Sequence, residues 1–334
     1  MASASSESSA SGIGLFVHFG LYSIVQYRHV TPLQRKKFRK EGGGNGSEWL
    51  KDILRYKDGD WRPPAGWKET QAYFRDKIGY DATYKDLNGQ LDSIDWTPEH
   101  IIRVAKKMKA SYVVFTTKHH DGYCLYPSDI SPEWSSRRDY VGELVTACRQ
   151  NGLQFGAYYS WPQFGEGCKV KYMNRVAIPH VHEIESRYHP DIWWFDGHWE
   201  IKSKTAQKMV SETVAYLKEK NKSVKINDRL GMEYKKKKTD LDWMGEATFR
   251  NFEDRFIPER KPTVPWEYID TVGFSWGRNS AQVEGDYKSG RRLIELYEKV
   301  KSIGGRFMMN VGPNPDGSID SFEEKSLEEF GKEI

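Results

Sequence analysis

The feature that most constrains the fold is a series of short, nearly continuous apolar runs rich in β-branched and aromatic residues. The runs are residues 13–20 (IGLFVHFG), 111–120 (SYVVFTTKHH), 153–161 (LQFGAYYSW), 191–196 (DIWWFD), 223–229 (SVKINDR), 271–277 (TVGFSWG) and 306–313 (RFMMNVGP). Runs without alternation of apolar and polar residues are typical of strands that are buried on both faces of a parallel sheet. We therefore predict seven strands here, and an eighth within 240–252.

Helical patterns separate these runs. Residues 97–110 carry Pro98 at the first helical position, followed by apolar residues at helical spacing. Similar patterns occur at 139–152, 181–188, 204–220 and 288–304. Strands alternating with helices predict an α/β fold, a (β/α)₈ TIM-like barrel in one domain over residues 13–334. A doubly wound open sheet is the competing architecture, but no G-x-G-x-x-G follows the first strand.

Charge and composition exclude several classes of partner. The 51 basic residues nearly balance the 47 acidic ones, for a net charge of +4, so neither a nucleic acid nor a membrane partner is indicated. We place the basic runs 35–40 and 235–238 on solvated loops, because aromatic residues do not alternate with them. No apolar run reaches the length of a membrane-spanning helix.

The first twelve residues are rich in serine and alanine. They have neither a basic start nor an apolar core, so we interpret 1–12 as a flexible leader or tag and find no signal peptide. The three cysteines show no C-x-x-C spacing that would indicate zinc or redox chemistry.

Polar side chains stand at the ends of the predicted strands. Asp196 is the clearest case, because it follows two tryptophans and a phenylalanine. A carboxylate is costly to desolvate unless another group compensates it. In a parallel barrel the carboxyl ends of all strands meet on one face, where active sites are built. We therefore expect a pocket that collects the residues at the strand ends: His18, His119, His120, Tyr158, Tyr159, Asp196, Asn227, Asp228, Arg229, Trp276 and Asn310.

The types of these residues favour a sugar site. Two adjacent histidines on a strand point to opposite faces, and no H-E-x-x-H motif is present, so we expect no metal and no cofactor. The G-x-S-x-G elbow of serine hydrolases is also absent. Imidazoles and amides bind hydroxyls, aromatic rings bind the apolar face of a pyranose, and two carboxylates can cleave a glycosidic bond. The long stretch 34–95 reads as an irregular loop on the same face, a length that is usually functional.

Several segments, taken in order, resemble the signature segments of the α-L-fucosidases, glycoside hydrolase family 29. They include SEW, VVFTTKHHDGYCLYPS, PDIWWFDGHW, INDR and GGRFMMNVGPNPDGSI, of which TTKHHDG and NVGPNPDG are highly specific, and the resemblance extends from about Gly14 to Ile319. It implies a retaining exo-hydrolase that removes terminal α-L-fucose from an oligosaccharide or glycoconjugate. It also implies a (β/α)₈-like catalytic domain, here without the family's usual C-terminal β-sandwich, and a secreted, periplasmic or lysosomal location.

The resemblance also implies roles for individual residues. Asp196 matches the nucleophile, and Glu253 is the best positional match for the acid/base, with Glu267 as runner-up and Glu246 and Glu259 as further possibilities. The residues that match sugar contacts are His18, Glu48, Trp49, His119, His120, Tyr158, Trp194 and Arg229.

Two alternatives and two departures from the family pattern remain. The chain could be a related exo-glycosidase for α-L-galactosides, or a carbohydrate-binding barrel that has lost catalysis. Phe19 replaces the tryptophan of the family's HWG segment, and Arg278 replaces a tyrosine. We interpret Arg278 as a solvent-facing change, with recognition of an acidic or sulfated sugar as the alternative.

Overall fold

The computed structural model describes residues 12–41, 43–44 and 46–334, so the expected leader lies almost wholly outside the described residues. Seven parallel strands form a single sheet in the order β5-β4-β3-β2-β1-β7-β6. The strands are β1 (Ile13–Val17), β2 (Tyr112–Lys118), β3 (Gln154–Ser160), β4 (Ile192–Asp196), β5 (Lys225–Ile226), β6 (Glu267–Thr271) and β7 (Arg306–Val311).

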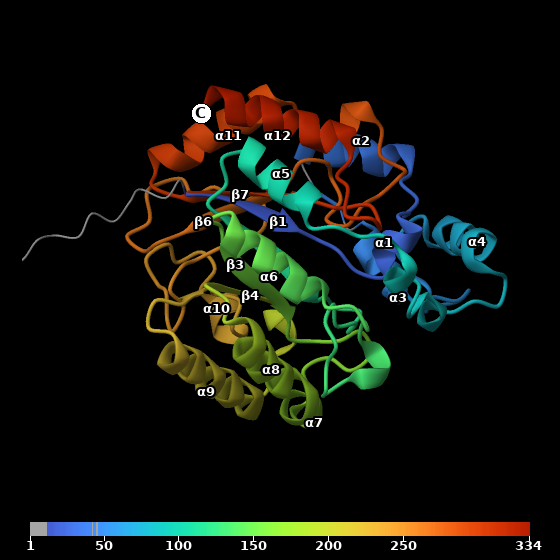
Figure 1. The fold of residues 1–334 in the computed structure, drawn as a ribbon, viewed down its shortest axis with the longest axis horizontal. Coiled ribbons are helices and arrows are strands. Elements are labelled where there is room, and N and C mark those ends of the chain that lie inside the picture. Colours follow the sequence, from blue (N-terminus) through green and yellow to red (C-terminus); the bar gives the residue numbers. More distant parts are fainter. Residues whose placement is uncertain (1–11, 42, 45) are drawn as a thin grey trace, which may run out of the picture.

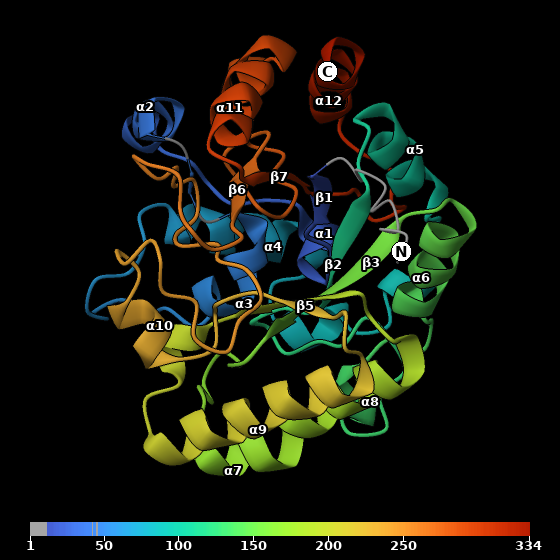
Figure 2. The ribbon, with the colours of Figure 1, turned by 90° about the vertical axis from the view of Figure 1, so that its left-hand side faces the viewer.

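The sheet is curled and has an inner and an outer face. Phe16, Tyr158 and Trp194 belong to one cluster of buried side chains, whereas their neighbours along the strands belong to a second, larger cluster. Helices surround the outer face, as Figure 2 shows. They are α5 (Glu99–Lys107), α6 (Tyr140–Gln150), α8 (Ile178–Tyr188), α9 (Lys204–Lys220), α11 (Gly290–Ser302) and α12 (Ser321–Glu333).

The eighth strand expected within 240–252 does not form as a regular strand. Residues 248–250 instead form backbone hydrogen bonds with both neighbouring strands. Thr248 N–H donates to Ile226 O at 2.8 Å, and Glu267 N–H donates to Arg250 O at 2.8 Å. This segment therefore links β5 to β6 through its backbone but is too short and irregular to count as a strand. The described residues form a curled seven-stranded sheet.

The strand predicted at 271–277 is wrong, because β6 comes earlier, at Glu267–Thr271. Its sequence, EYIDT, looked polar, yet all five residues are buried. The two carboxylates are compensated: Glu267 accepts hydrogen bonds from Tyr112 and Trp194, and Asp270 forms ion pairs with Arg255 and Lys288. The strand does not show in the hydropathy pattern, because its two carboxylates are polar in sequence but are compensated inside the fold.

The stretch 34–95 is also more regular than expected. It contains α3 (Leu50–Ile53) and α4 (Trp67–Ile78), which lie beside α1 (Tyr22–Val25) in Figure 1. Within α4, the Gln71 side chain donates to two backbone carbonyls near the end of α3, and this fixes the helix in place. The short helices of this stretch are η1 (Ser47–Trp49), η2 (Tyr84–Leu87) and η3 (Leu91–Ser93).

The basic runs lie partly on helices rather than on loops. Residues 35–40 belong to α2 (Pro32–Glu41), and 235–238 begin in α10 (Met232–Lys236). None of the helices in the described part of the chain is long and apolar enough to cross a membrane. The remaining elements are η4 (Pro132–Trp134), α7 (Val170–Tyr172), the π-helix η5 (Met173–Ala177), η6 (His198–Glu200) and η7 (Glu284–Asp286).

Candidate active site

A cavity of ≈ 120 Å³ lies where the inner face of the sheet meets the loops that follow the strands. Asp196 and all eight residues that match sugar contacts line it, whereas Glu253 does not. The structure therefore brings these nine residues together around one cavity. The lining residues are Phe16, His18, Glu48, Trp49, His119, His120, Tyr158, Trp194, Asp196, Trp199, Arg229, Asp254 and Trp276.

Asp196 is the last residue of β4 and is only 8% exposed. Its Oδ1 accepts a hydrogen bond from Arg229 Nη1 at 2.8 Å, and its Oδ2 accepts one from the Tyr158 hydroxyl at 3.0 Å. Burial alone would raise the pKa of Asp196, but the charge of Arg229 and the contact with His120 hold that pKa well below its usual range. The arrangement keeps Asp196 as a carboxylate, the form that a nucleophile requires.

His120 is oriented by a short hydrogen-bond chain. The Ser160 hydroxyl donates to Pro162 O at 2.7 Å, so it accepts from Nδ1–H of His120, which lies 2.6 Å away. The other ring nitrogen, Nε2, lies 3.4 Å from Asp196 Oδ2. Ser160 and Asp196 therefore contact opposite nitrogens of the His120 ring.

His18 presents a hydrogen-bond acceptor to the cavity. The Asn310 amide donates to Trp276 O at 2.8 Å, which leaves its oxygen to accept from His18 Nδ1–H at 2.6 Å. The free nitrogen of the ring, Nε2, is therefore unprotonated in the neutral residue. Burial lowers the pKa of His18 to about 4, so this neutral form persists in the folded protein at neutral pH.

His119 and His120 both line the cavity because β2 ends at Lys118, just before them. The pairing of β2 with β3 also shifts register between Thr116 and Lys118. The strict alternation of a strand therefore does not apply to this pair. The His119 ring stacks on Tyr158, with ring centres 5.5 Å apart, and its buried Nδ1 has no hydrogen-bond partner among the described residues.

Glu48 and Trp49 come from the first long connection. Glu48 is 1% exposed, and its two oxygens accept backbone N–H bonds from Gly46 at 2.7 Å and Gly277 at 2.9 Å. Burial raises the pKa of this carboxyl. Glu48 thus ties this connection to the loop after β6 and places the Trp49 ring against His120, with centres 5.8 Å apart.

Trp194 and Arg229 connect the cavity floor to its rim. The Trp194 indole donates to Glu267 Oε1 at 3.1 Å, and the Arg229 guanidinium lies 4.5 Å above its ring centre. Arg229 also forms an ion pair with Asp254, so one cation joins two carboxylates.

The candidate acid/base residues lie in different surroundings. Glu253 is 57% exposed, pairs with Lys238 at 2.5 Å, and lines an adjoining cavity of ≈ 420 Å³ that shares Trp199, Arg229 and Asp254 with the first. Glu267 is completely buried and accepts hydrogen bonds from Tyr112, Trp194 and Asn251, so it belongs to the core beneath the site.

Asp254 was missed by sequence reasoning. Its side chain is 34% exposed and lines both cavities. Its position beside Glu253 in NFEDRF is the feature of the sequence that could have indicated it, but the acid/base candidates in this segment were all glutamates. The turn is unusual, because Phe252 and Arg255 adopt φ of 56° and 63°, a conformation that costs non-glycine residues free energy and is common at functional sites.

Arg278 does not face solvent, contrary to our interpretation. Its guanidinium pairs with Asp320 at 2.7 Å and donates to the Tyr287 hydroxyl at 3.1 Å, with 16% of the side chain exposed. These contacts use its charge inside the fold, which also argues against recognition of an acidic sugar. Among the described residues, no group of three or more His, Cys, Asp or Glu could hold a metal ion.

The chain is similar to known proteins over most of its length. The sequence model of the α-L-fucosidase family matches residues 7–333. The chain belongs to this family. It is 27% identical to tissue alpha-L-fucosidase of Macaca fascicularis over 96% of its own length, and 28% identical to alpha-L-fucosidase of Dictyostelium discoideum over 95%. The chain spans 64% of the Macaca protein, less than two thirds of its length.

Solved α-L-fucosidase structures share the fold. The Thermotoga maritima alpha-fucosidase in complex with fucose superposes with a TM-score of 0.76 and 27% identity, covering 97% of this chain and 72% of that one. The alpha-L-fucosidase of Lactobacillus casei, at 22% identity, gives a TM-score of 0.71 and supports the fold alone.

The neutral His18 predicts a pH dependence of stability. Its pKa is about 4 in the folded protein, against 6.5 for the ordinary group, so the unfolded chain binds more protons between these values. The contribution is complete above pH 6.5 and decreases as the pH falls towards 4, by about 2 kcal/mol between pH 7 and pH 5. Urea unfolding at pH 7 and pH 5 tests this for His18→Gln. Its free energy of unfolding should decrease between these pH values by about 2 kcal/mol less than that of the wild type. Equal decreases in the two proteins would contradict the assignment.

Proposed function

We propose that this protein is a retaining exo-α-L-fucosidase that hydrolyses terminal α-L-fucosides of oligosaccharides or glycoconjugates. The observation that carries the proposal is the buried carboxylate of Asp196, held ionised by Arg229 and His120 at the floor of a cavity lined by imidazoles and tryptophans. Family membership and the fold shared with a fucose-bound relative support the choice of sugar.

The proposed mechanism has two displacement steps. Asp196 attacks the anomeric carbon, the glycosidic C–O bond breaks, and the acid/base residue gives its proton to the departing oxygen. Water then attacks the glycosyl-enzyme; the same residue takes a proton from that water, and Asp196 departs as a carboxylate. A cavity of ≈ 120 Å³ is smaller than the sites of larger ligands, which favours a single terminal sugar over the interior of a chain.

For the acid/base we propose the turn that carries Glu253 and Asp254. Glu253 remains the first candidate, because the cavity that it lines shares wall residues with the cavity of Asp196. To act, it would have to leave Lys238. Asp254 is the second candidate, and its carboxyl group pairs with the Arg229 guanidinium.

We also propose that the domain is a closed (β/α)₈-like barrel over residues 13–334. The support is the segment 248–250, whose backbone bonds to Ile226 on one side and to Pro265 and Glu267 on the other. Such a segment takes the place of an eighth strand between β5 and β6.

A panel of nitrophenyl glycosides tests the proposed activity. We expect the α-L-fucoside to be preferred over the α-L-galactoside by up to about 10²-fold in kcat/KM, the scale on which a pocket rejects an added hydroxyl. Preference for the galactoside would support the related exo-glycosidase instead. Binding of fucose without hydrolysis of any glycoside would support a non-catalytic carbohydrate-binding protein.

A further inference from the structure

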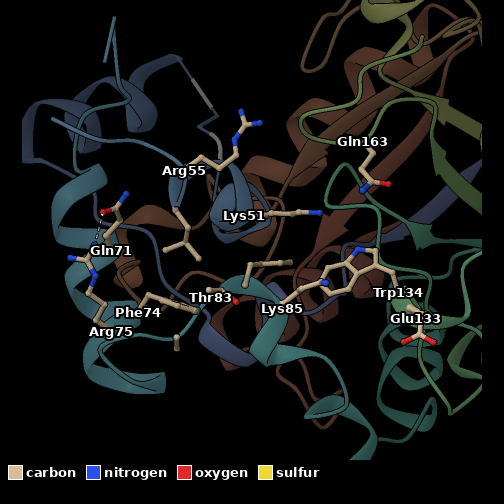
Figure 3. A pocket seen from close by; sticks show the side chains of 13 residues that line it. Lys51, Arg55, Gln71, Phe74, Arg75, Thr83, Lys85, Glu133, Trp134 and Gln163 are labelled. Carbon is tan, nitrogen blue, oxygen red and sulfur yellow. Dashed lines mark hydrogen bonds between the residues drawn. The ribbon is translucent and has the colours of Figure 1, made fainter. Parts of the chain in front are cut away.

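A second cavity, of ≈ 670 Å³, lies beside the proposed active site and is not used by the mechanism. Its wall comes from α3, α4, η2, η4 and the loop after β3, as Figure 3 shows. This volume is typical of sites that bind small molecules.

The cavity is strongly basic. Four cationic side chains line it, Lys51, Arg55, Arg75 and Lys85, against the single carboxylate of Glu133. Arg55 and Arg75 are partly engaged, since Arg55 pairs with Asp52 and Arg75 donates to Gln71 at 3.3 Å. The excess of positive charge favours a ligand with a negative group.

Lys51 is the most enclosed of these cations. Its ammonium donates to the backbone oxygen of Asp121 at 2.5 Å and lies 4.9 Å from the centre of the Trp134 ring. An ammonium has three donors, and this is its one acceptor found among the described residues. Burial lowers the pKa of Lys51; the carboxylate of Asp121 opposes this effect, whereas the charges of Arg55 and Lys85 add to it, so three cations and one buried carboxylate act on the same region. An anion placed there would relieve the repulsion among the cations.

The rest of the wall suits a sugar. Leu54, Phe74 and Trp134 provide apolar and aromatic surface, and the Gln163 amide offers both a donor and an acceptor. Figure 3 shows Lys51 extending into the space between Trp134 and Gln163. Apolar surface beside amide and charged groups is the combination that binds the C–H face, the hydroxyls and the acidic substituent of a sugar.

Only a thin layer separates this cavity from that of Asp196. The rings of Trp49, His120 and Phe164 pack together with centres 5.2–5.8 Å apart. Trp49 and His120 line the proposed active site, whereas Lys51, two positions after Trp49, and Gln163, next to Phe164, line the second cavity. The two cavities therefore adjoin the same cluster of rings.

We propose that the second cavity binds an acidic sugar, one bearing a carboxylate or a sulfate, from the same glycan whose terminal residue enters the Asp196 cavity. The link to that glycan rests on the proposed function, whereas binding of the acidic sugar itself does not. The protein would then act preferentially on fucosylated glycans that carry a negative charge near the fucose.

The test measures direct binding by calorimetry and ligand-observed NMR, with L-fucose in excess to occupy the other cavity. The probes are glucuronic acid, N-acetylglucosamine 6-sulfate, neutral N-acetylglucosamine and inorganic sulfate. We expect one or both of the acidic sugars to bind at least about tenfold more tightly than the neutral sugar, with affinity decreasing as salt is added. The two acidic probes distinguish carboxylate from sulfate recognition.

Charge reversal locates the binding. Lys85→Glu should weaken the acidic sugars about tenfold or more, whereas Lys222→Glu, the same change at an exposed lysine after α9, should not. Equal binding of neutral and acidic sugars, an unchanged affinity in Lys85→Glu, or inorganic sulfate binding as tightly as the sulfated sugar would each overturn the proposal. If the acidic sugars bind as expected but no fucoside is hydrolysed, the proposed function fails and the second site stands.

Discussion

Asp196→Ala is expected to lower kcat for an aryl α-L-fucoside by about 10³-fold or more, because removing a nucleophile removes the covalent route. The fold should survive, since Arg229 keeps its ion pair with Asp254 when Asp196 is lost. Steady-state kinetics and a urea unfolding curve of the same preparation separate the two effects. A variant that hydrolyses the fucoside near the wild-type rate would contradict the proposed role.

Azide provides the matching control for this variant. A small anion can enter the space that the carboxylate leaves and attack the anomeric carbon from the same face. Added azide should therefore restore part of the activity of Asp196→Ala and yield the β-configured fucosyl azide. Rescue that gave the α-azide would place the missing nucleophile on the other face of the sugar.

The second large effect concerns Glu253. Its removal should hurt substrates with poor leaving groups most, because activated aryl groups depart without a proton. We expect Glu253→Ala to lose about 10²-fold or more in kcat on a natural α-fucoside and much less on nitrophenyl fucoside.

Parallel variants decide between the carboxylates of the same region. Asp254→Ala tests the neighbouring candidate, and Glu259→Ala serves as an exposed control nearby. If Asp254→Ala shows the leaving-group dependence and Glu253→Ala does not, the acid/base role belongs to Asp254. If neither variant shows it, the turn at 252–255 does not supply the acid.

The sequence predicted the parts of the fold that depend on apolar burial. Five strands were placed correctly from β1 to β5, and β7 as well; except for the short β5, they lie in nearly continuous apolar runs. The wall of the Asp196 cavity followed from the same logic together with the family resemblance: polar residues at the carboxyl ends of parallel strands come together on one face.

What the sequence did not reveal depends on long-range pairing of charges. β6 was missed because Glu267 and Asp270 interrupt its apolar pattern, although partners from other elements compensate both carboxylates inside the core. Arg278 was misread for the same reason, since its partner Asp320 lies 42 positions away in the chain. Asp254 becomes visible as a site residue only when Arg229 is seen to join it to Asp196.

The most direct test of the central claim is to trap the covalent intermediate. In a 2-deoxy-2-fluoro-fucosyl fluoride, the fluoride on the anomeric carbon is a good leaving group, so the glycosyl-enzyme forms readily. The fluorine on C2 slows the hydrolysis that follows, so the adduct accumulates. Peptide mapping by mass spectrometry should then find one fluorofucosyl group on the peptide that contains Asp196, and on that side chain when the peptide is fragmented. A label on another residue, or hydrolysis of α-L-fucosides with inversion and no label, would contradict the assignment of Asp196 as the nucleophile.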